Sequence, residues 1–210
     1  MKETINSLKI ISNESYKIIK HIFFIINYVM ILEVTEKKMR LFRPNITYNT
    51  YKDIDLNLLI SKNIDTILID IDNTLAAHDE ALPSDEAKAF INKIKDKGIN
   101  IFTMSNNNED RVSLFSDALN VKGYSFSLKP LKKTYRKILK ENTNINNVAI
   151  IGDQLLTDIL GGNRMKFITI YTKPLVNKDI TFTKFNRFFE RFILNILEKK
   201  NLLKVGEYYE

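Results

Sequence analysis

The chain has 210 residues, 44% of them apolar, which is enough for one sizeable domain with its own core. It contains no Cys and only two His, so disulfides, thiolate catalysis and Cys-based zinc sites are excluded and a His-rich metal site or a His-based triad is not expected. The net charge of +7 suits a nucleic acid, an anionic membrane surface or a phosphorylated substrate, and equally a Lys-rich solvated surface.

The first 38 residues differ from the rest of the chain. Between His21 and Leu32 they contain a run of 12 residues, HIFFIINYVMIL, that is apolar except for His21 and Asn27. The run is shorter than the ~20 residues that a helix needs to cross a bilayer. We expect residues 1–38 to be an extension with a short apolar helix that lies on a membrane or packs on protein, ahead of one domain over 39–210. The alternative is an extension outside the folded domain.

Strand-like and helix-like segments alternate from Lys52 onward. Strands are expected over 66–71, 99–105, 147–153 and 166–174, a short strand or loop over 124–130, and helices over 84–98, 108–120, 132–142, 154–165 and 183–204. Ser84 is expected to cap the first helix, and Gly161 and Gly162 to end the fourth. Such alternation implies right-handed crossovers, so the sequence predicts an α/β fold with a Rossmann-like parallel sheet and helices on both faces.

Polar residues gather at the ends of four of these segments. They are Asp70, Asp72, Asn73 and Thr74 after the first strand, Ser105, Asn106 and Asn107 after the second, Lys129 near the end of 124–130, and Gly152, Asp153 and Asp158 after 148–151. Ligands of open α/β sheets bind at the carboxyl ends of the strands, so we expect these residues to converge on one crevice.

The chemistry of this crevice points to a cation and a phosphate. Four carboxylates packed together repel one another unless a cation offsets their charge. Oxygen ligands without Cys select a hard ion such as Mg²⁺. Lys129 can hold a phosphoryl oxygen, and Ser105 and Asn106 can donate neutral hydrogen bonds to it. Asp70 and Asp72 lie two apart and share one side of the backbone, so one can attack phosphorus while the other handles the proton of the leaving group.

The four segments resemble, in order, the motifs of the haloacid dehalogenase superfamily of phosphatases. DIDNT (70–74) resembles the nucleophile loop, TMSNN (103–107) the Ser/Thr motif, LKP (128–130) the Lys motif and IIGDQLLTD (150–158) the acidic metal motif.

The resemblance implies a role for each matched residue. Asp70 would be the nucleophile that forms an aspartyl-phosphate, and Asp72 the general acid and base that also lends its backbone carbonyl to Mg²⁺. Ser105 and Lys129 would bind the phosphoryl group. The other Mg²⁺ ligands would be Asp70, Asp153 and, directly or through water, Asp158.

The spacing of the motifs leaves no room for a cap domain. The intervals from Asp70 to Ser105 and from Lys129 to Asp153 each hold one expected helix. The crevice should therefore be open, which suits a bulky or surface-bound phosphate ester better than a small free metabolite.

Longer stretches resemble the YqeG subfamily, whose eukaryotic relatives are phosphatidylglycerophosphate phosphatases. The stretches are MRLFRP, DIDNTL, SNNNEDRV and GDQLLTDILGGNRM, and the resemblance covers about residues 39–200. It implies hydrolysis of phosphatidylglycerophosphate to phosphatidylglycerol. The alternatives are a phosphatase of a soluble sugar or nucleotide phosphate, and a non-catalytic basic protein for RNA or a ribosome partner, although no nucleic-acid motif accompanies the charge.

The last expected helix bears on where the protein works. Its segment KFNRFFERFILNILEKK (184–200) carries aromatic and basic residues that suit an anionic lipid, or an apolar stripe that packs on the sheet. We expect a cytoplasmic enzyme, peripheral on the inner face of the membrane. The sequence leaves two alternatives for each of two residues. Arg164 either binds a second phosphate or head group or lies on the surface. His78 either touches substrate or lies in an exposed loop.

Overall fold

The computed structural model describes residues 39–142, 145–176 and 181–209, and side chains within α8 only from residue 190. Backbone contacts divide the chain into two units, 1–40 and 41–210, and the second unit carries the sheet and the site. The apolar helix expected within 1–38 lies outside the described residues.

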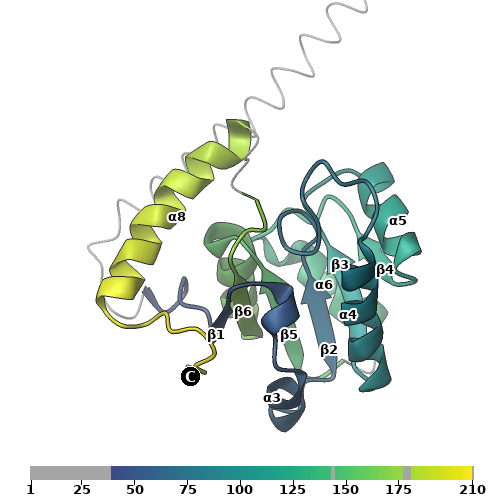
Figure 1. Ribbon diagram of the computed structural model, residues 1–210, viewed down its shortest axis with the longest axis horizontal. Coiled ribbons are helices and arrows are strands. Elements are labelled where there is room, and N and C mark those ends of the chain that lie inside the picture. Colours follow the sequence, from purple (N-terminus) through teal and green to yellow (C-terminus); the bar gives the residue numbers. More distant parts are fainter. Residues whose placement is uncertain (1–38, 143–144, 177–180, 210) are drawn as a thin grey trace, which may run out of the picture. The chain divides into compact units, whose positions relative to one another are not determined.

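A six-stranded sheet forms the centre of this second unit (Figure 1). Every strand pairs in parallel with its neighbours, and the spatial order is β1-β6-β5-β2-β3-β4. The strands are β1 (Ile46–Tyr48), β2 (Thr66–Ile69), β3 (Asn100–Met104), β4 (Lys122–Tyr124), β5 (Val148–Gly152) and β6 (Ile168–Thr172). The predicted parallel α/β sheet is therefore confirmed.

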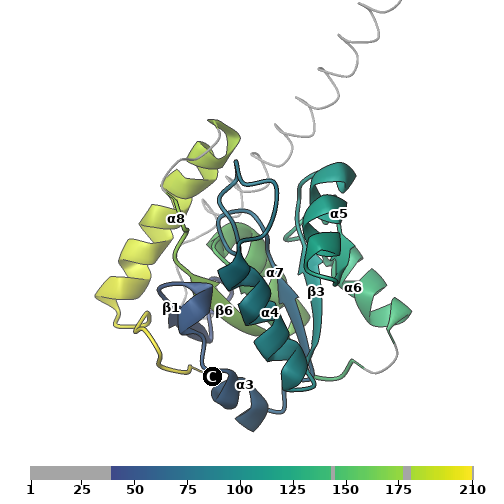
Figure 2. The ribbon, with the colours of Figure 1, turned by 45° about the vertical axis from the view of Figure 1, so that its right-hand side comes forward.

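Helices connect the strands. They are η1 (Tyr51–Asp53), α3 (Leu56–Ser61), α4 (Asp85–Asp96), α5 (Glu109–Ala118), α6 (Lys132–Glu141), η2 (Leu155–Ile159), α7 (Leu160–Met165) and α8 (Thr181–Lys199). Figures 1 and 2 both show α8 beside the β1 edge of the sheet and α5 beside the opposite edge. From Asp70 to Ser105 the chain forms a loop, α4 and β3, so this interval holds no cap domain, as predicted.

The two faces of the sheet are covered by different helices. Ile67 and Ile69 of β2 belong to a core cluster that includes residues of α4 and α5. Leu68, between them, belongs to a second cluster that includes Tyr135 and Ile138 of α6. Successive strand residues point to opposite faces, so this alternation shows that apolar helices pack on both sides. The continuous apolar run of β2 follows from burial on both faces.

Local capping explains where two predicted helices begin. The hydroxyl of Ser84 accepts a hydrogen bond from Ala87 N at 3.2 Å, so α4 begins at Asp85 as predicted. The side chain of Asn108 accepts one from Arg111 N at 2.9 Å and starts α5. Both caps satisfy backbone donors that the first helical turn leaves free.

The structure corrects the prediction that Gly161 and Gly162 end a helix. Residues 155–159 form a π-helix, and α7 then runs through both glycines to Met165. A Cβ atom at Gly161 would clash with Tyr135, and one at Gly162 would clash with Ile150. The glycines therefore allow the helix to approach α6 and β5 closely.

A short strand or a loop was expected over 124–130. The strand β4 ends at Tyr124, and the residues from there to α6 form a loop, so the loop alternative is confirmed for most of this range. The short edge strand β1 and the helix α3 were not predicted. β1 has only three residues, and its partner strand β6 lies more than a hundred residues later in the sequence, so no local pattern marks it.

The described part of α8 packs on the domain. Ile193 and Leu197 are buried, which supports the interpretation of an apolar stripe on the core, whereas Phe192 is 55% exposed. The aromatic side chains expected at 185, 188 and 189 are not among those described. Within the described residues, no helix combines the length and the apolar character that membrane crossing requires.

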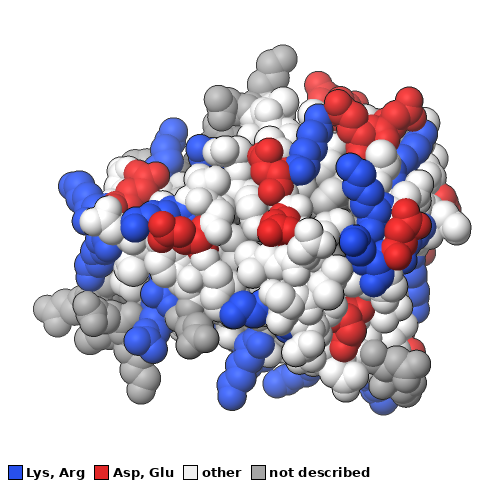
Figure 3. Space-filling view, turned by 60° about the horizontal axis from the view of Figure 1, so that its bottom comes forward, with Lys and Arg blue, Asp and Glu red and all other residues white. Residues whose placement is uncertain are grey.

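Charged residues of both signs are mixed on the face in Figure 3, which turns the bottom of Figure 1 toward the reader. Lys and Arg lie close to Asp and Glu over the described residues visible there. The excess positive charge of the chain is therefore not gathered into one basic patch on that face, as a nucleic-acid groove would require.

Candidate active site

A tight loop after β2 carries the first acidic residues. Asp70 N donates to Ile151 O at 2.9 Å, and the amides of Leu75 and Ala76 donate to Ile71 O at 2.9 and 3.1 Å. Asn73 adopts a left-handed backbone conformation, with φ of 65°, that a short polar side chain tolerates. The loop therefore holds Asp70 at the carboxyl edge of the sheet.

Three carboxylates converge next to this loop. Asp70, Asp153 and Asp158 each offer an oxygen within 4.8 Å of the others, and all three side chains are buried. The hydroxyl of Thr74, in the loop after β2, donates to Asp153 Oδ1 at 3.3 Å. The predicted convergence of the first and last motifs is thus present in the structure.

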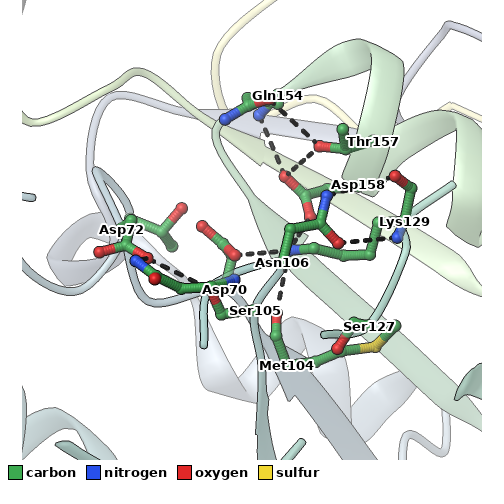
Figure 4. Close-up of polar contacts among 12 residues, drawn as sticks. Asp70, Asp72, Met104, Ser105, Asn106, Ser127, Lys129, Gln154, Thr157 and Asp158 are labelled. Carbon is green, nitrogen blue, oxygen red and sulfur yellow. Dashed lines mark hydrogen bonds and ion pairs between the residues drawn. The ribbon is translucent and has the colours of Figure 1, made fainter. Parts of the chain in front are cut away.

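Lys129 places its ammonium among these acids (Figure 4). Its Nζ atom forms an ion pair with Asp70 Oδ1, lies 2.7 Å from Asp158 Oδ1 and donates to Met104 O at 2.9 Å. The residue is only 3% exposed. Among these described side chains, one ammonium faces three buried carboxylates, so negative groups outnumber positive ones.

The pKa values of this pair reflect that imbalance. Burial raises the pKa of the Asp70 carboxyl well above its usual value, Lys129 opposes this, and the charges of Asp158, Asp153 and Asp72 reinforce it. Burial by itself would lower the pKa of Lys129, but the charges of Asp158 and Asp70 outweigh it and raise that pKa. Lys129 therefore stays protonated.

The carboxylate of Asp72 lies apart from this trio, in a separate set of contacts. Its Oδ2 atom accepts from Ser105 Oγ at 3.2 Å and from Asn107 Nδ2 at 3.4 Å. Its Oδ1 atom faces Arg111, with Nη2 at 3.2 Å, and His78, with Nδ1 at 3.4 Å. The carboxylate of Asp72 therefore lies outside the acidic trio, and the contact of its backbone carbonyl with a metal stays a prediction.

Asn106 bonds to the backbone of Lys129. Its Oδ1 atom accepts from Lys129 N at 2.8 Å, and its Nδ2 atom donates to Lys129 O at 3.3 Å. Both ends of the amide are therefore used to position Lys129, and a direct contact of Asn106 with a phosphoryl group stays a prediction. Arg164 supports the same loop, because its Nη1 atom donates to Pro130 O at 3.1 Å, next to the cis Lys129–Pro130 bond.

Two residues of this region had no role in the sequence analysis. Arg111, in the first turn of α5, holds Asp72, beside Asn107 of the predicted crevice, which is a second donor. Glu190 of α8 is buried and accepts from Leu156 N at 3.1 Å, in the segment that carries Asp158. Arg111 lies three residues after Asn108, which caps α5 at the sheet edge, and this position was a usable signal, whereas Glu190 carries none in the sequence.

The residues present fit a hard divalent cation. The trio of Asp70, Asp153 and Asp158 offers oxygen ligands only, and its negative charge exceeds that of Lys129. Asp158 Oδ2 already accepts from Gln154 N at 3.2 Å and from Thr157 Oγ1 at 3.3 Å, so this carboxylate is firmly oriented. The described residues therefore include a site with the composition that an Mg²⁺-type ion requires.

Comparison with known proteins identifies the family. The model of the family described as mitochondrial PGP phosphatase matches residues 26–176. The chain belongs to this family. The match begins upstream of the domain boundary predicted at residue 39 and ends before α8.

Individual relatives agree with the family match. The chain is 36% identical over 150 residues to "Probable phosphatase YqeG" of Bacillus subtilis, covering 71% of this chain and 87% of the relative. The predicted resemblance to haloacid dehalogenase phosphatases of the YqeG type is confirmed, and the chain is an enzyme of this phosphatase class.

Two solved structures are also similar. One is a haloacid dehalogenase superfamily (subfamily III A) hydrolase from Legionella pneumophila, with 17% identity, a TM-score of 0.38 and coverage of 70% of this chain and 96% of that one. The other is the cobalt-bound deoxy-D-mannose-octulosonate 8-phosphate phosphatase of Haemophilus influenzae, with 14% identity, a TM-score of 0.41 and coverage of 69% and 95%.

Proposed function

We propose that this member of the mitochondrial PGP phosphatase family hydrolyses phosphatidylglycerophosphate to phosphatidylglycerol, with Mg²⁺ and through an aspartyl-phosphate. The observation that carries the proposal is the pairing of buried Asp70 with Lys129, beside Asp153 and Asp158. A nucleophilic carboxylate, a fixed ammonium and a cation-binding oxygen set are the parts that phosphoryl transfer needs. The substrate follows the family description, and the absence of a cap between Asp70 and Ser105 leaves room for a large ester.

In the first step, a carboxylate oxygen of Asp70 attacks phosphorus. A new bond forms between this oxygen and phosphorus, and the bond from phosphorus to the glycerol oxygen breaks. Asp72 in its protonated form gives its proton to the departing oxygen. Lys129, fixed by Met104 O and Asp158, offsets the negative charge on the phosphoryl oxygens.

In the second step, water releases the phosphate. Asp72, now a carboxylate, takes a proton from the attacking water, a new bond joins the water oxygen to phosphorus, and the bond to Asp70 breaks. Inorganic phosphate leaves and both aspartates return to their starting states. Arg111, Ser105 and Asn107 hold the Asp72 carboxylate for both proton transfers.

Asp70, Asp153 and the backbone carbonyl of Asp72 would hold Mg²⁺, with Asp158 in direct or water-mediated support. When bound, the ion lowers the cost of bringing an anionic phosphate to the carboxylates and stabilises the transferred charge. We place the enzyme at the inner face of the membrane, as a peripheral protein, because its substrate is an anionic lipid.

The test is Mg²⁺-dependent phosphate release from phosphatidylglycerophosphate in mixed micelles, with a panel of water-soluble phosphate esters beside it. The wild type should release phosphate from the lipid, and Asp70→Asn should abolish release. Asp79→Asn, at an exposed position near the same loop, is the matched control and should be fully active. Preference for a soluble sugar or nucleotide ester would overturn the proposed substrate. Equal activity of wild type and Asp70→Asn would overturn the mechanism.

A further inference from the structure

The loop 126–131, between β4 and α6, buries polar side chains and exposes apolar ones. Ser127 and Lys129 point inward and are 0% and 3% exposed. Phe126 and Leu128, which alternate with them, are 59% and 50% exposed, and Leu131 is 38% exposed. A surface loop ordinarily buries its apolar side chains and exposes its polar ones. Here three large apolar side chains stand in solvent beside the lysine of the active site.

Hydrogen bonds fix this arrangement. Phe126 N donates to Asn107 O at 2.9 Å, and Ser127 N donates to Ser105 O at 3.0 Å. Leu131 N donates to Leu128 O at 2.8 Å, and Asn106 clamps Lys129 from both sides. The loop is therefore tied to the segment after β3, and its apolar side chains are held outward by the contacts that hold Lys129 inward.

Several local features of this loop oppose folding stability. Phe126 and Leu128 have φ of 44° and 52°, a conformation that large side chains rarely adopt. Leu131 occupies the N-cap of α6 without a side-chain hydrogen bond. Two lysines, Lys132 and Lys133, open α6, although positive charge is unfavourable at a helix N-terminus. Since none of these features stabilises the fold, they require another explanation.

The charge beside the loop indicates what the apolar side chains meet. Lys132 and Lys133 follow Leu131 directly, and Arg136 lies further along α6; Lys133 and Arg136 are exposed. Among the described residues, no ion pair engages any of the three. Apolar side chains bordered by unpaired cations match the boundary of a bilayer, where acyl chains lie beneath anionic head groups.

We propose that loop 126–131 docks this enzyme on anionic bilayers. Phe126, Leu128 and Leu131 enter the boundary between head groups and acyl chains, and Lys132, Lys133 and Arg136 contact the lipid phosphates. The inference rests on the proposed function and extends it: Lys129 lies between Leu128 and Leu131, so docking brings the phosphoryl-binding lysine to the depth of a lipid head group.

The test measures binding of the full chain to vesicles of phosphatidylcholine with and without phosphatidylglycerol, by co-sedimentation. The variant Phe126→Asn/Leu128→Asn removes the apolar side chains, and Asn tolerates positive φ, so the loop can keep its backbone. We expect the wild type to bind the anionic vesicles. The affinity of this variant should be lower by about tenfold or more, because it loses apolar area that the bilayer would bury. Lys132→Ala/Lys133→Ala should weaken binding to anionic vesicles by about tenfold as well, and more so at low salt.

Matched variants exclude other causes. Leu114→Asn, at an exposed leucine of α5, should bind vesicles like the wild type. Asp70→Asn should also bind normally, because docking precedes chemistry, so loss of the lipid phosphatase activity and loss of docking are separate results. Thermal unfolding of each variant checks that it is folded.

Four outcomes would overturn the docking proposal. The wild type could fail to bind anionic vesicles, or the Phe126→Asn/Leu128→Asn variant could bind like the wild type. Phe192→Asn could lose vesicle binding while the loop variant keeps it, which would assign docking to α8. Finally, the double variant could turn an oligomer into a monomer and still bind vesicles, which would make the loop a contact between copies of the chain.

Discussion

Arg111 holds Asp72 from the first turn of α5. Its Nε and Nη2 atoms lie 3.4 and 3.2 Å from Asp72 Oδ1, and both side chains are mostly buried. The guanidinium also lies 5.3 Å from the ring of Phe115, which limits its movement. The acid and base that the proposed mechanism requires is thus oriented by a residue outside the matched motif positions.

Replacing Arg111 by Met should therefore lower kcat. Met keeps most of the length and apolar contact of the side chain but removes the hydrogen bonds to Asp72. We expect a loss of about 10- to 100-fold in kcat, the range for a hydrogen bond to a charged group, with KM little changed. Steady-state kinetics on a water-soluble phosphate ester measures this. Arg111→Lys should fall in between, because Lys keeps the charge and loses the planar fork.

Lys93→Met, on an exposed part of α4, is the control for loss of a basic side chain and should keep wild-type kcat. A rise in KM with kcat unchanged would instead assign Arg111 to substrate binding.

Asp70 should lower the stability of the folded protein when no metal is bound. Burial and neighbouring carboxylates raise its pKa in the folded protein, so its contribution is most favourable below the ordinary carboxyl pKa of 3.8 and is lost as pH rises through the raised value. Asp70→Asn does not titrate there and keeps Lys129 paired with Asp158. We expect the variant to be more stable than the wild type at neutral pH by about 1 kcal/mol, or about 2–4 °C in Tm.

Thermal unfolding in the presence of a chelator, over a pH series, measures this difference. It should shrink toward zero as the solution becomes acidic, because Asp70 is then protonated in both the folded and the unfolded states. Asp79→Asn should show no gain at any pH. A lower Tm for Asp70→Asn at neutral pH would show that the Asp70–Lys129 pair stabilises the metal-free fold.

The sequence predicted the elements that local pattern determines. β2 (TILI) is buried at every position and its residues 67–69 are all apolar because both faces of the strand are covered, and Ser84 and Asn108 start helices through bonds to residues three positions away. Because parallel strands end at one edge, the positions of Asp70, Lys129 and Asp153 also followed from the order of strands and helices.

What the sequence could not predict depends on distant partners. Asn106 turns to the backbone of Lys129, and Thr74 turns to Asp153, because tertiary contacts decide which acceptor each side chain finds. The role of Gly161 could not be predicted from the sequence either. Helix-ending and close-packing glycines are alike in sequence, and only the position of Tyr135 distinguishes them.

Gly152 should control metal affinity through Asp158. A Cβ atom at this position would collide with the carboxyl group and Cβ of Asp158, whose side chain lies directly against the end of β5. Gly152→Ala should displace that carboxylate and weaken Mg²⁺ binding by about 10- to 100-fold, the range found when a supporting contact of a metal site is lost. Calorimetric titration of the purified protein with Mg²⁺ measures the change.

Asp158→Asn is the reference for this experiment, because it removes the carboxylate charge and leaves β5 unchanged. If Gly152→Ala bound Mg²⁺ as tightly as the wild type does, Asp158 would not be a residue that supports the metal.

Tyr135 and Gly161 should be coupled energetically. Gly161→Ala would place a Cβ against the Tyr135 hydroxyl and 2.9 Å from its Cζ atom. Overpacking of this kind costs ~1–3 kcal/mol and outweighs the gain in helix propensity that Ala brings. Tyr135→Phe alone should be close to neutral, because the buried Tyr135 hydroxyl has no hydrogen-bond partner within the described chain.

Combining the two substitutions should recover part of the loss. Phe lacks the oxygen that the new Cβ meets first, so the double variant should be more stable than the sum of the single effects by about 1 kcal/mol. Urea unfolding of the four proteins gives this coupling energy directly. Strictly additive effects would mean that α7 shifts away from α6 as a whole, and then Arg164 of the same helix should release Pro130 as well.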